Sequence, residues 1–335
     1  MNTLLINKRV IVLGSNSFAG SALVTSLLEN GALVLGINRS PKNHFIFRQH
    51  EWNFSSENFK FLQADINNDL AIINSTIIEF KPDIVVDFAG QGMVAESWQN
   101  PDEWYLTNLV AKVRIHDIFR KINTIEKYIR ISTPEVYGNS DKLIKENNIY
   151  LPSTPYAVSH SAIDMSLSAY YQRYNFPVII TRFANFYGPG QQLYRIIPRT
   201  IIYALMNKKL QLQGGGTSIR AFIYSTDVAT AIIKTILVGK IGEIYHFSPD
   251  DFYSISDVVV KIANKLNIEF KDIVEVTAER PGKDHAYLME SSKAKMELNW
   301  SNKVSLDQGI EETHKWIIDN FNIIKNLPLE YKHKR

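Results

Sequence analysis

The side chains best suited to chemistry lie between residues 132 and 160. Thr133 and Glu135 directly follow an apolar run that predicts a buried strand. They should therefore stand at the carboxyl end of that strand, which is where open parallel sheets bind their ligands. Tyr156 and His160 are four residues apart, so on a helix they share one face. A hydroxyl, a carboxylate, a phenol and an imidazole are thus predicted to converge on one pocket, where they can transfer protons.

The chain on either side of this stretch predicts the elements that must position these groups. Thr154 is a suitable helix N-cap and Pro155 suits the first helical position, so a helix is expected to begin there. Apolar runs that alternate with helical patterns predict an α/β fold with a doubly wound parallel sheet. Strands are expected at 9–14, 32–37, 59–64, 84–90, 127–132, 178–182 and 245–247, and helices at 69–80, at 101–121 and from 155 onward. Amphipathic patterns at 256–268 and 305–321 predict helices of a smaller second lobe.

A glycine-containing turn follows the first predicted strand. Gly14 ends that strand and Gly20 lies at the start of a helical pattern. Strand, turn and helix in this order form a site for a pyrophosphate, because backbone N–H groups and the helix N-terminus approach the anion. Alternatively, the two glycines serve only the steric needs of the turn.

The end of the second predicted strand bears on the choice of cofactor. Its last residues are Asn38 and Arg39, with no acidic residue. An arginine here accommodates a 2′-phosphate, whereas an acidic residue would accept from ribose hydroxyls. The sequence therefore favours NADP over NAD, although Asn38 can still bond a free hydroxyl and Arg39 can be solvated.

Composition restricts the class of protein. The 335 residues are 45% hydrophobic and 21% charged, which is typical of a globular chain large enough for two lobes. A net charge of +3 is too small to indicate a nucleic-acid partner, and the basic residues 332–335 are expected to be a solvated end. The absence of cysteine excludes disulfides and thiolate metal sites, and no metal is predicted. No apolar stretch reaches membrane-spanning length, so a cytoplasmic protein is expected.

Several motifs, in the order found here, carry a resemblance to a known family. They are the glycine turn at 14–20, STPEVYG at 132–138, Tyr156 with its partner four residues on, RFANFYGP at 182–189, RAFIYSTDVA at 220–229 and RPGKD at 280–284. From about residue 8 to residue 320 the chain resembles the extended short-chain dehydrogenases/reductases. Within that superfamily it is most similar to the nucleotide-sugar 4,6-dehydratases that act on dTDP-glucose, GDP-mannose or CDP-glucose.

The resemblance implies two domains, a cofactor site and a dimer. Residues 1–183 with 225–250 correspond to an NAD(P)-binding Rossmann domain, and residues 184–224 with 251–335 to a nucleotide-sugar-binding domain. Relatives pair two subunits through helices that match 101–121 and 155–175, so a homodimer is implied. The residues implied to bind the cofactor are Gly14, Asn16, Ser17, Phe18, Gly20, Asn38, Arg39, Ser40, Asp65, Ile66, Ala89, Gly90, Gln91, Asn108, Ser132, Tyr156, His160 and Phe183.

The reaction implied by the resemblance removes water from the hexose of a nucleotide-diphosphate sugar. Tyr156 takes the proton of the sugar 4-hydroxyl while hydride passes from C4 to the nicotinamide, and Thr133 bonds the same oxygen. Glu135 then removes the C5 proton and helps water to leave from C6, after which hydride returns to C6. The product is a 4-keto-6-deoxy sugar nucleotide. The residues implied to bind the substrate are Asn185, Arg195, Arg199, Arg220 and Arg280.

Three positions depart from the family pattern. Ser17 replaces the middle glycine of the turn, where its side chain either crowds the pyrophosphate or bonds it. Pro134 replaces an aspartate and leaves Glu135 alone, as in the GDP-mannose type. His160 replaces the lysine that binds the nicotinamide ribose and stabilises tyrosinate. Imidazole can supply a ribose hydrogen bond, and a cation only when it is protonated, so His160 is either a working substitute or a structural residue in a weakened enzyme.

Other functions stay open at this level. A 4-epimerase of the same superfamily needs no carboxylate at position 135, and a UDP-glucuronate decarboxylase shares Glu135 but needs a cation for the substrate carboxylate. A non-catalytic protein that binds NADP or a sugar nucleotide would also be consistent with the exchange at His160. The sequence does not determine the nucleobase or the sugar.

Overall fold

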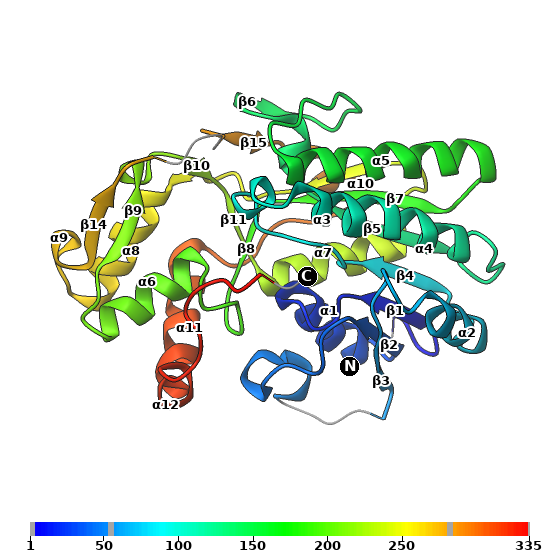
Figure 1. Cartoon of the computed structure of the whole chain (residues 1–335), viewed down its shortest axis with the longest axis horizontal. Helices are drawn as coiled ribbons and strands as arrows, with labels where there is room; N and C mark the ends of the chain where they lie inside the picture. The colour runs from blue at the N-terminus through cyan, green and yellow to red at the C-terminus, as the bar shows by residue number, and fades with distance from the viewer. Residues whose placement is uncertain (1–3, 53–56, 280–283, 334–335) are drawn as a thin grey trace.

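Seven parallel strands form the central sheet (Figure 1). The computed structural model describes residues 4–52, 57–279 and 284–333. The strands are β1 (Arg9–Leu13), β2 (Leu33–Asn38), β3 (Phe59–Gln63), β4 (Ile84–Asp87), β5 (Lys127–Ser132), β7 (Val178–Phe183) and β12 (Ile244–Phe247), in the order β12-β7-β5-β4-β1-β2-β3. The order changes direction between β1 and β4, and sheets of this kind bind ligands outside the carboxyl ends of their strands at that point. The predicted doubly wound α/β class is confirmed.

Helices cover both faces of this sheet. One face carries α1 (Phe18–Glu29), α7 (Ser225–Val238) and α10 (Ser292–Leu298). The other carries α2 (Leu70–Phe80), α4 (Lys112–Phe119) and α5 (Pro155–Tyr174). Because each inner strand is buried on both sides, its sequence is a nearly continuous apolar run, as in β1 and β4.

The helix that carries Tyr156 begins where the sequence predicts. The Thr154 side chain accepts a hydrogen bond from the N–H of Ala157 at 3.1 Å, and Pro155 occupies the first turn. The helix ends at Asn175, whose φ of 52° is left-handed and stops the helical repeat.

The predicted helix over 101–121 is present, but it is not α-helical throughout. The segment consists of α3 (Pro101–Tyr105), a π-helical segment (Leu106–Ala111) and α4. Helical side-chain periodicity does not reveal such a local widening of the helix. Segments of this kind occur frequently at functional sites.

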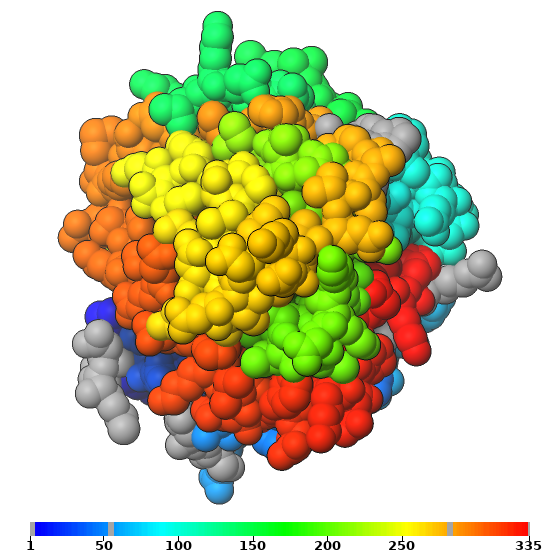
Figure 2. Space-filling model, turned by 90° about the vertical axis from the view of Figure 1, so that its left-hand side faces the viewer, coloured from blue at the N-terminus to red at the C-terminus, as the bar shows by residue number. Residues whose placement is uncertain are grey.

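A second lobe packs beside the carboxyl ends of the strands, and Figure 2 looks onto its outer face, where α8 is yellow and α6 yellow-green. Its helices are α6 (Ile196–Leu205), α8 (Ile255–Leu266), α9 (Phe270–Ile273), α11 (Leu306–Asp319) and α12 (Phe321–Ile324). Its two-stranded sheets pair β8 (Asn185–Tyr187) with β11 (Phe222–Tyr224), β9 (Leu210–Gln213) with β14 (Val274–Thr277), and β10 (Ile219–Arg220) with β13 (Tyr253–Ser254). The predicted amphipathic helices of this lobe are confirmed as α8 and α11.

Two late segments return to the first lobe. Strand β15 (Tyr287–Met289) pairs in parallel with β6 (Ser140–Ile144), which follows the Glu135 loop. Helix α10 and Trp300 belong to the apolar core on the α1 and α7 face of the sheet. Short 3₁₀ turns lie at Phe45–Phe47, Gln49–Glu51, Glu96–Trp98, Pro134–Tyr137 and Gly214–Gly216.

Residues 329–333, which we call the C-terminal strap, run from α12 back to the centre of the molecule (Figure 1). His333 stacks on Trp104 with ring centroids 5.0 Å apart, and it pairs with Glu103. The prediction of a solvated end is therefore wrong for His333, because its ring finds partners on α3. Within the described residues, no helix has the length and apolarity that a bilayer-spanning segment needs.

Candidate active site

The glycine turn between β1 and α1 is shaped by close packing. Gly14 has a φ of +83°, and a Cβ there would come within 3.0 Å of the backbone N of Ala89. A Cβ on Gly20 would meet the carbonyl oxygen of Gly14 at 2.3 Å. Ser17 fits because its φ is −68° and its hydroxyl caps α1 by accepting from the N–H of Gly20 at 3.0 Å. The serine therefore completes the turn that would otherwise rely on a third glycine.

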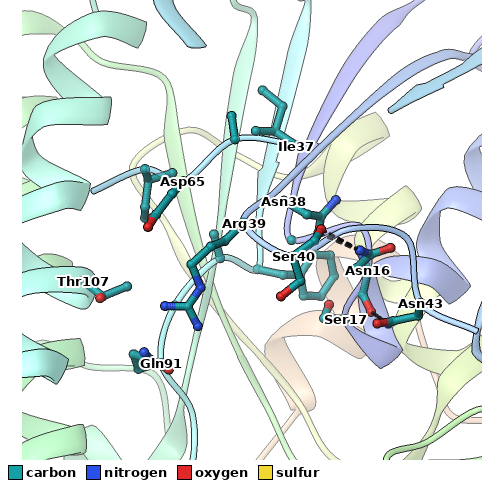
Figure 3. A pocket seen from close by; sticks show the side chains of 16 residues that line it. Asn16, Ser17, Ile37, Asn38, Arg39, Ser40, Asn43, Asp65, Gln91 and Thr107 are labelled. Carbon is teal, nitrogen blue, oxygen red and sulfur yellow. Dashed lines mark hydrogen bonds between the residues drawn. The ribbon is translucent and has the colours of Figure 1, made fainter. Parts of the chain in front are cut away.

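Asn38, at the end of β2, braces this turn. Its side-chain oxygen accepts from the N–H of Asn16 at 2.7 Å, and its amide donates to the Ser15 hydroxyl at 2.6 Å. Arg39, the next residue, extends its side chain into the cavity that Figure 3 shows. The neighbouring Asp65 carboxylate accepts from Asn67 and Asn68 in its own turn. The end of β2 thus offers a guanidinium and no carboxylate.

Two cavities lie along the carboxyl edge of the sheet. The smaller, of about 230 Å³, is lined by most of the residues predicted to bind the cofactor: Gly14, Asn16, Ser17, Asn38, Arg39, Ser40, Asp65, Ile66, Ala89, Gly90 and Gln91. The larger, of about 890 Å³, is lined by Phe18, Ser132, Thr133, Glu135, Tyr156, His160, Phe183, Asn185, Arg195, Arg199 and Arg220. Residues Ser17, Arg39, Asn43, Phe88, Ala89, Gly90 and Gln91 line both cavities. The two cavities therefore form one groove that runs from β2 to α5.

Two residues predicted to bind the cofactor, Gly20 and Asn108, line neither cavity. Asn108 lies in the π-helical segment, where its side-chain oxygen accepts from the N–H of Gln91 at 2.7 Å. Its amide donates to the Gln91 carbonyl at 3.0 Å and to the Ser159 hydroxyl at 3.1 Å. Asn108 therefore ties the Gly90 loop to α5, and its role is to position that wall of the groove.

Tyr156 and Thr133 meet as predicted. Burial and the neighbouring Glu135 carboxylate raise the pKa of Tyr156, while a hydrogen bond with Thr133 and the charges of Arg130 and Arg195 act in the opposite direction. The phenol therefore needs positive charge nearby in order to act as a base. Three of these groups, Thr133, Glu135 and Tyr156, lie on the same cavity wall.

Glu135 stands in the 3₁₀ turn that follows β5, and its side chain is partly buried. Burial raises its pKa above the ordinary value, and its backbone hydrogen bond, Arg220 and the Tyr287 hydroxyl limit the rise. Tyr287 donates to Glu135 Oε1 at 3.1 Å. A carboxyl group with a raised pKa suits both the removal and the return of a proton near neutral pH.

His160 lies one helical turn after Tyr156, and the two ring centroids are 4.4 Å apart. Arg130 Nη2 lies 2.9 Å from His160 Nδ1. Burial and the charges of Arg130 and Lys112 hold the pKa of His160 well below its ordinary value. The contact with Arg130 and the lowered pKa both favour the neutral imidazole over a cation that replaces lysine.

The predicted substrate residues differ in the contacts that they make. Asn185 and Arg195 line the large cavity, Arg195 at the N-terminal end of α6. Arg199, one turn later, pairs with Glu330 of the C-terminal strap at 2.6 Å. Arg220 donates to the carbonyl oxygens of residues 284 and 285 and packs over the Tyr287 ring. Arg280 lies outside the described residues.

The sequence alone missed four side chains of this site. Tyr287 and Arg130 contact Glu135 and His160 respectively, and Tyr331 and Lys332 of the C-terminal strap line the large cavity. Arg130 lies within an apolar strand two residues before Ser132, and a charged residue inside a buried strand is a signal that could have been used. Nothing local in the sequence indicates the other three, because their positions depend on long-range pairing.

Comparison with known proteins agrees with this geometry. The family model described as GDP-mannose 4,6 dehydratase matches residues 11–313. A human protein named dTDP-D-glucose 4,6-dehydratase is 32% identical over 327 residues, which cover 96% of this chain and 93% of the relative.

Two solved structures are similar over nearly the whole chain. A dTDP-glucose 4,6-dehydratase from Streptomyces venezuelae with NAD bound has a TM-score of 0.87 at 25% identity, covering 94% of this chain and 98% of the other. A UDP-glucuronic acid 4-epimerase from Bacillus cereus, in complex with UDP-glucuronic acid and NAD, has a TM-score of 0.83 at 25% identity, covering 93% and 99%. The chain belongs to the GDP-mannose 4,6-dehydratase family of the extended short-chain dehydrogenases/reductases.

Proposed function

We propose that the protein is a nucleotide-sugar 4,6-dehydratase that converts a nucleotide-diphosphate hexose into its 4-keto-6-deoxy product. The observation that carries this proposal is the position of Glu135 beside Tyr156 and Thr133 in one cavity. A phenol and a hydroxyl suffice for oxidation at C4. An elimination across C5 and C6 requires a further group that can take and return a proton. The carboxyl group of Glu135, whose pKa is raised by burial, meets this requirement.

The groove fits a nicotinamide dinucleotide as the cofactor. Gly14 and Gly20 let the turn between β1 and α1 close tightly, so that backbone N–H groups and the N-terminus of α1 can approach a pyrophosphate. Residues of the smaller cavity would hold the adenosine half, and Ser132, Phe183 and His160 the nicotinamide half. When bound, the nicotinamide would accept hydride from C4 of the sugar and return it at C6. We assign this role to the lobe formed by residues 1–183 and 225–250, to which α10 is added because it packs in the same core.

In this proposal Tyr156 accepts the proton of the sugar 4-hydroxyl, and Thr133 bonds the same oxygen. The resulting ketone acidifies the hydrogen at C5. Glu135 removes that proton, and the hydroxyl leaves C6 as water after it gains a proton from the carboxyl group. Glu135 is thus ionised again at the end of the elimination. When hydride returns to C6, C5 gains one proton, which balances the proton that Tyr156 took from the 4-hydroxyl.

The substrate lobe, residues 184–224 and 251–335 without α10, would hold the nucleotide diphosphate. Arg195 lines the cavity from the start of α6, and a guanidinium binds phosphate oxygens through two parallel hydrogen bonds. The guanidinium of Arg220 packs against the Tyr287 ring and donates hydrogen bonds to backbone carbonyl oxygens. These bonds fix its position, from which its charge acts on Glu135 and on the substrate. The human relative is named for dTDP-glucose, and we propose a nucleotide-diphosphate glucose or mannose as the substrate class.

We further propose that the cofactor is NADP or NAD, with NADP favoured. Arg39 extends into the smaller cavity, and no carboxylate stands at the end of β2. A guanidinium there pairs with a 2′-phosphate, whereas NAD-binding folds usually place an acid at this point. The structurally similar dehydratase and epimerase were solved with NAD, so direct binding measurements with both dinucleotides are required.

We also propose that two copies pair through α3, α4 and α5. Trp98, Leu106 and Met165 are each more than half exposed on this side of the molecule. Apolar side chains of this size gathered on adjacent helices mark an interaction surface. Sedimentation analysis that gives the mass of one chain at micromolar concentration would contradict the dimer.

The second candidate function is a 4-epimerase, since an epimerase is among the similar structures. An epimerase has no step for Glu135. The test is to incubate the protein and either dinucleotide with nucleotide-diphosphate glucose or mannose and to measure the absorbance of the 4-keto product in alkali. We expect Glu135→Gln to abolish that product while reduced dinucleotide still forms, and Glu146→Gln to serve as the control.

Glu146 is also a carboxylate whose pKa is raised by burial, but it lines neither cavity and accepts from the N–H of His246. Epimerised sugar nucleotide with no keto product from the wild type would favour the second candidate. Binding of dinucleotide and sugar nucleotide without any conversion would favour the non-catalytic alternative.

A further inference from the structure

An uncompensated positive charge lies buried behind Tyr156. The guanidinium groups of Arg130 and Arg182 both pair with the single carboxylate of Asp164, at 3.5 Å and 3.2 Å. All three side chains are almost completely buried. Asp164 also accepts from the Ser132 hydroxyl at 2.6 Å. Two cations that share one anion leave the cluster with a net positive charge, which is costly in a protein interior.

The guanidinium of Arg130 contacts the imidazole of His160. A guanidinium can only donate hydrogen bonds, so His160 Nδ1, at 2.9 Å from Arg130 Nη2, must be the acceptor. The imidazole proton therefore resides on Nε2, and the ring is neutral. His160 lines the large cavity, and its ring lies against that of Tyr156.

Every other charged group around the imidazole opposes its protonation or is already paired. Lys112 approaches from α4 and adds a second positive charge, although it is paired with Asp87. Asp164, on α5, is shared between Arg130 and Arg182. An imidazolium at position 160 would thus face two cations from two elements with no unshared carboxylate among the described residues.

We propose that Arg130 supplies, from behind His160, the positive charge that the family's lysine would carry, and that it holds His160 as a neutral N–H donor toward the cofactor. This inference rests on the proposed function. The two tasks of one lysine are divided between two residues on different elements. Arg130 on β5 contributes the charge that favours ionisation of Tyr156, and His160 on α5 contributes the hydrogen bond to a ribose hydroxyl. Arg130 is in this sense a positioning residue.

The first test needs neither substrate nor cofactor. Nitrogen-15 NMR of the protein's histidines, assigned with His160→Gln, reports which ring nitrogen carries the proton. We expect the Nε2–H form of His160 in the wild type, with no titration through the ordinary range near pH 6.5. In Arg130→Met the Nδ1 bond and one opposing charge are lost, so we expect the pKa of the imidazole to rise, while burial still holds it below the ordinary value.

Arg182→Met is the matched control, because it removes the other guanidinium from the same carboxylate and leaves the Arg130 bond in place. Arg130→Met should fold, since Asp164 keeps Arg182 as its partner. If that variant does not fold, the wild-type spectrum still decides the question. An Nδ1–H tautomer, or a His160 that titrates at an ordinary pH in the wild type, overturns the proposal.

The second test is rescue by lysine. We expect Arg130→Met to lower kcat at neutral pH by at least about tenfold, because an opposite charge within 4–6 Å shifts such a pKa by about one to three units. The same variant should move the acidic limb of the kcat profile to higher pH and leave KM nearly unchanged. Adding His160→Lys should recover most of that loss, since a lysine then has no guanidinium to oppose it.

In the wild-type background His160→Lys should instead lower activity, because the new ammonium group would face Arg130. Arg182→Met combined with His160→Lys should show no recovery. A merely structural Arg130 would give equal losses for the two arginine variants and no rescue, which would refute the proposal. If the protein proves to be an epimerase or a binding protein, the NMR result is unaffected, so failure of the function and failure of this inference are distinguishable.

Discussion

The phenol of Tyr287 donates a hydrogen bond to Oε1 of Glu135 at 3.1 Å, across 152 residues of sequence. The contact depends on the pairing of β15 with β6, which brings the late strand beside the loop that follows β5. The guanidinium of Arg220 packs over the same ring, 4.0 Å from its centroid. Residues from late in the sequence therefore limit the rise that burial causes in the pKa of the proposed base.

We expect Tyr287→Phe to move the acidic limb of kcat/KM to higher pH by about one unit, since a hydrogen bond to a charged group contributes about 1.5–3 kcal/mol. The Tyr287 hydroxyl holds down the pKa of Glu135, which burial raises. Without it the carboxyl group stays protonated to higher pH and cannot accept the C5 proton there. The control is Tyr245→Phe, which removes a tyrosine–glutamate bond of 3.0 Å to Glu297, outside both cavities. An unchanged profile in Tyr287→Phe would show that the contact does not act on the base.

The sequence predicted the part of the site that depends on strand ends and helix starts. Thr133 and Glu135 follow β5 directly, and Tyr156 and His160 share a face of α5, so local rules were sufficient. The parallel sheet was predictable for the same reason, because alternating strands and helices can close in few ways.

The parts that could not be predicted arise from contacts between distant segments. The neutral state of His160 depends on Arg130, and no rule for α5 alone reveals a guanidinium on a neighbouring strand. The π-helical segment around Asn108 keeps a helical pattern in sequence, so it was indistinguishable from an α-helix. Residues 332–335 were predicted to be a solvated end because of their charge, whereas His333 stacks on Trp104.

Arg39 provides a test of cofactor choice. We expect Arg39→Ala to weaken binding of NADP by about tenfold to a hundredfold, the range expected for loss of a charged hydrogen bond, and to change binding of NAD little. The guanidinium extends into the smaller cavity, where a 2′-phosphate would lie. Titration of each dinucleotide, followed by tryptophan fluorescence, measures both constants. Lys42→Ala is the control, because Lys42 lies over the Phe61 ring and lines neither cavity. Equal losses for both dinucleotides would contradict a role in recognising the 2′-phosphate.

Buried histidines make the free energy of unfolding depend on pH. Burial lowers the pKa of His116 to about 3, whereas in the unfolded chain it is near 6.5. Between these values the unfolded state binds a proton that the folded state does not, so the free energy of unfolding falls as the pH drops below about 6.5. The loss is about 1.4 kcal/mol per pH unit for each such group.

We therefore expect His116→Gln to reduce the slope of unfolding free energy against pH by about 1.4 kcal/mol per unit between about pH 5 and 6. The variant is also less stable at neutral pH, because the ring packs against Tyr128 and bonds its hydroxyl at 3.0 Å. Urea unfolding at a series of pH values separates the two effects, and the exposed His285→Gln is the control. The same slope in the wild type and in His116→Gln would mean that His116 is protonated in the folded protein.

We expect the C-terminal strap, which lies outside the family motifs, to contribute to ligand binding. Tyr331 contacts Tyr194 with ring centroids 5.3 Å apart, and Glu330 pairs with Arg199, so the strap is anchored on the substrate lobe before His333 reaches Trp104. This path places Lys332 on the wall of the large cavity.

We expect Lys332→Ala to raise the dissociation constant of the nucleotide sugar by about tenfold, because a charged hydrogen bond to a phosphate contributes about 1.5–3 kcal/mol. The change should leave kcat within about twofold, since binding energy that is equal in the ground and transition states does not alter kcat. Calorimetric titration of the nucleoside diphosphate alone measures the effect without turnover. Lys325→Ala, at the exposed end of α12, is the matched control. If both lysine variants bind the diphosphate as the wild type does, the strap covers the cavity without recognising its ligand, and its aromatic contacts alone account for its position.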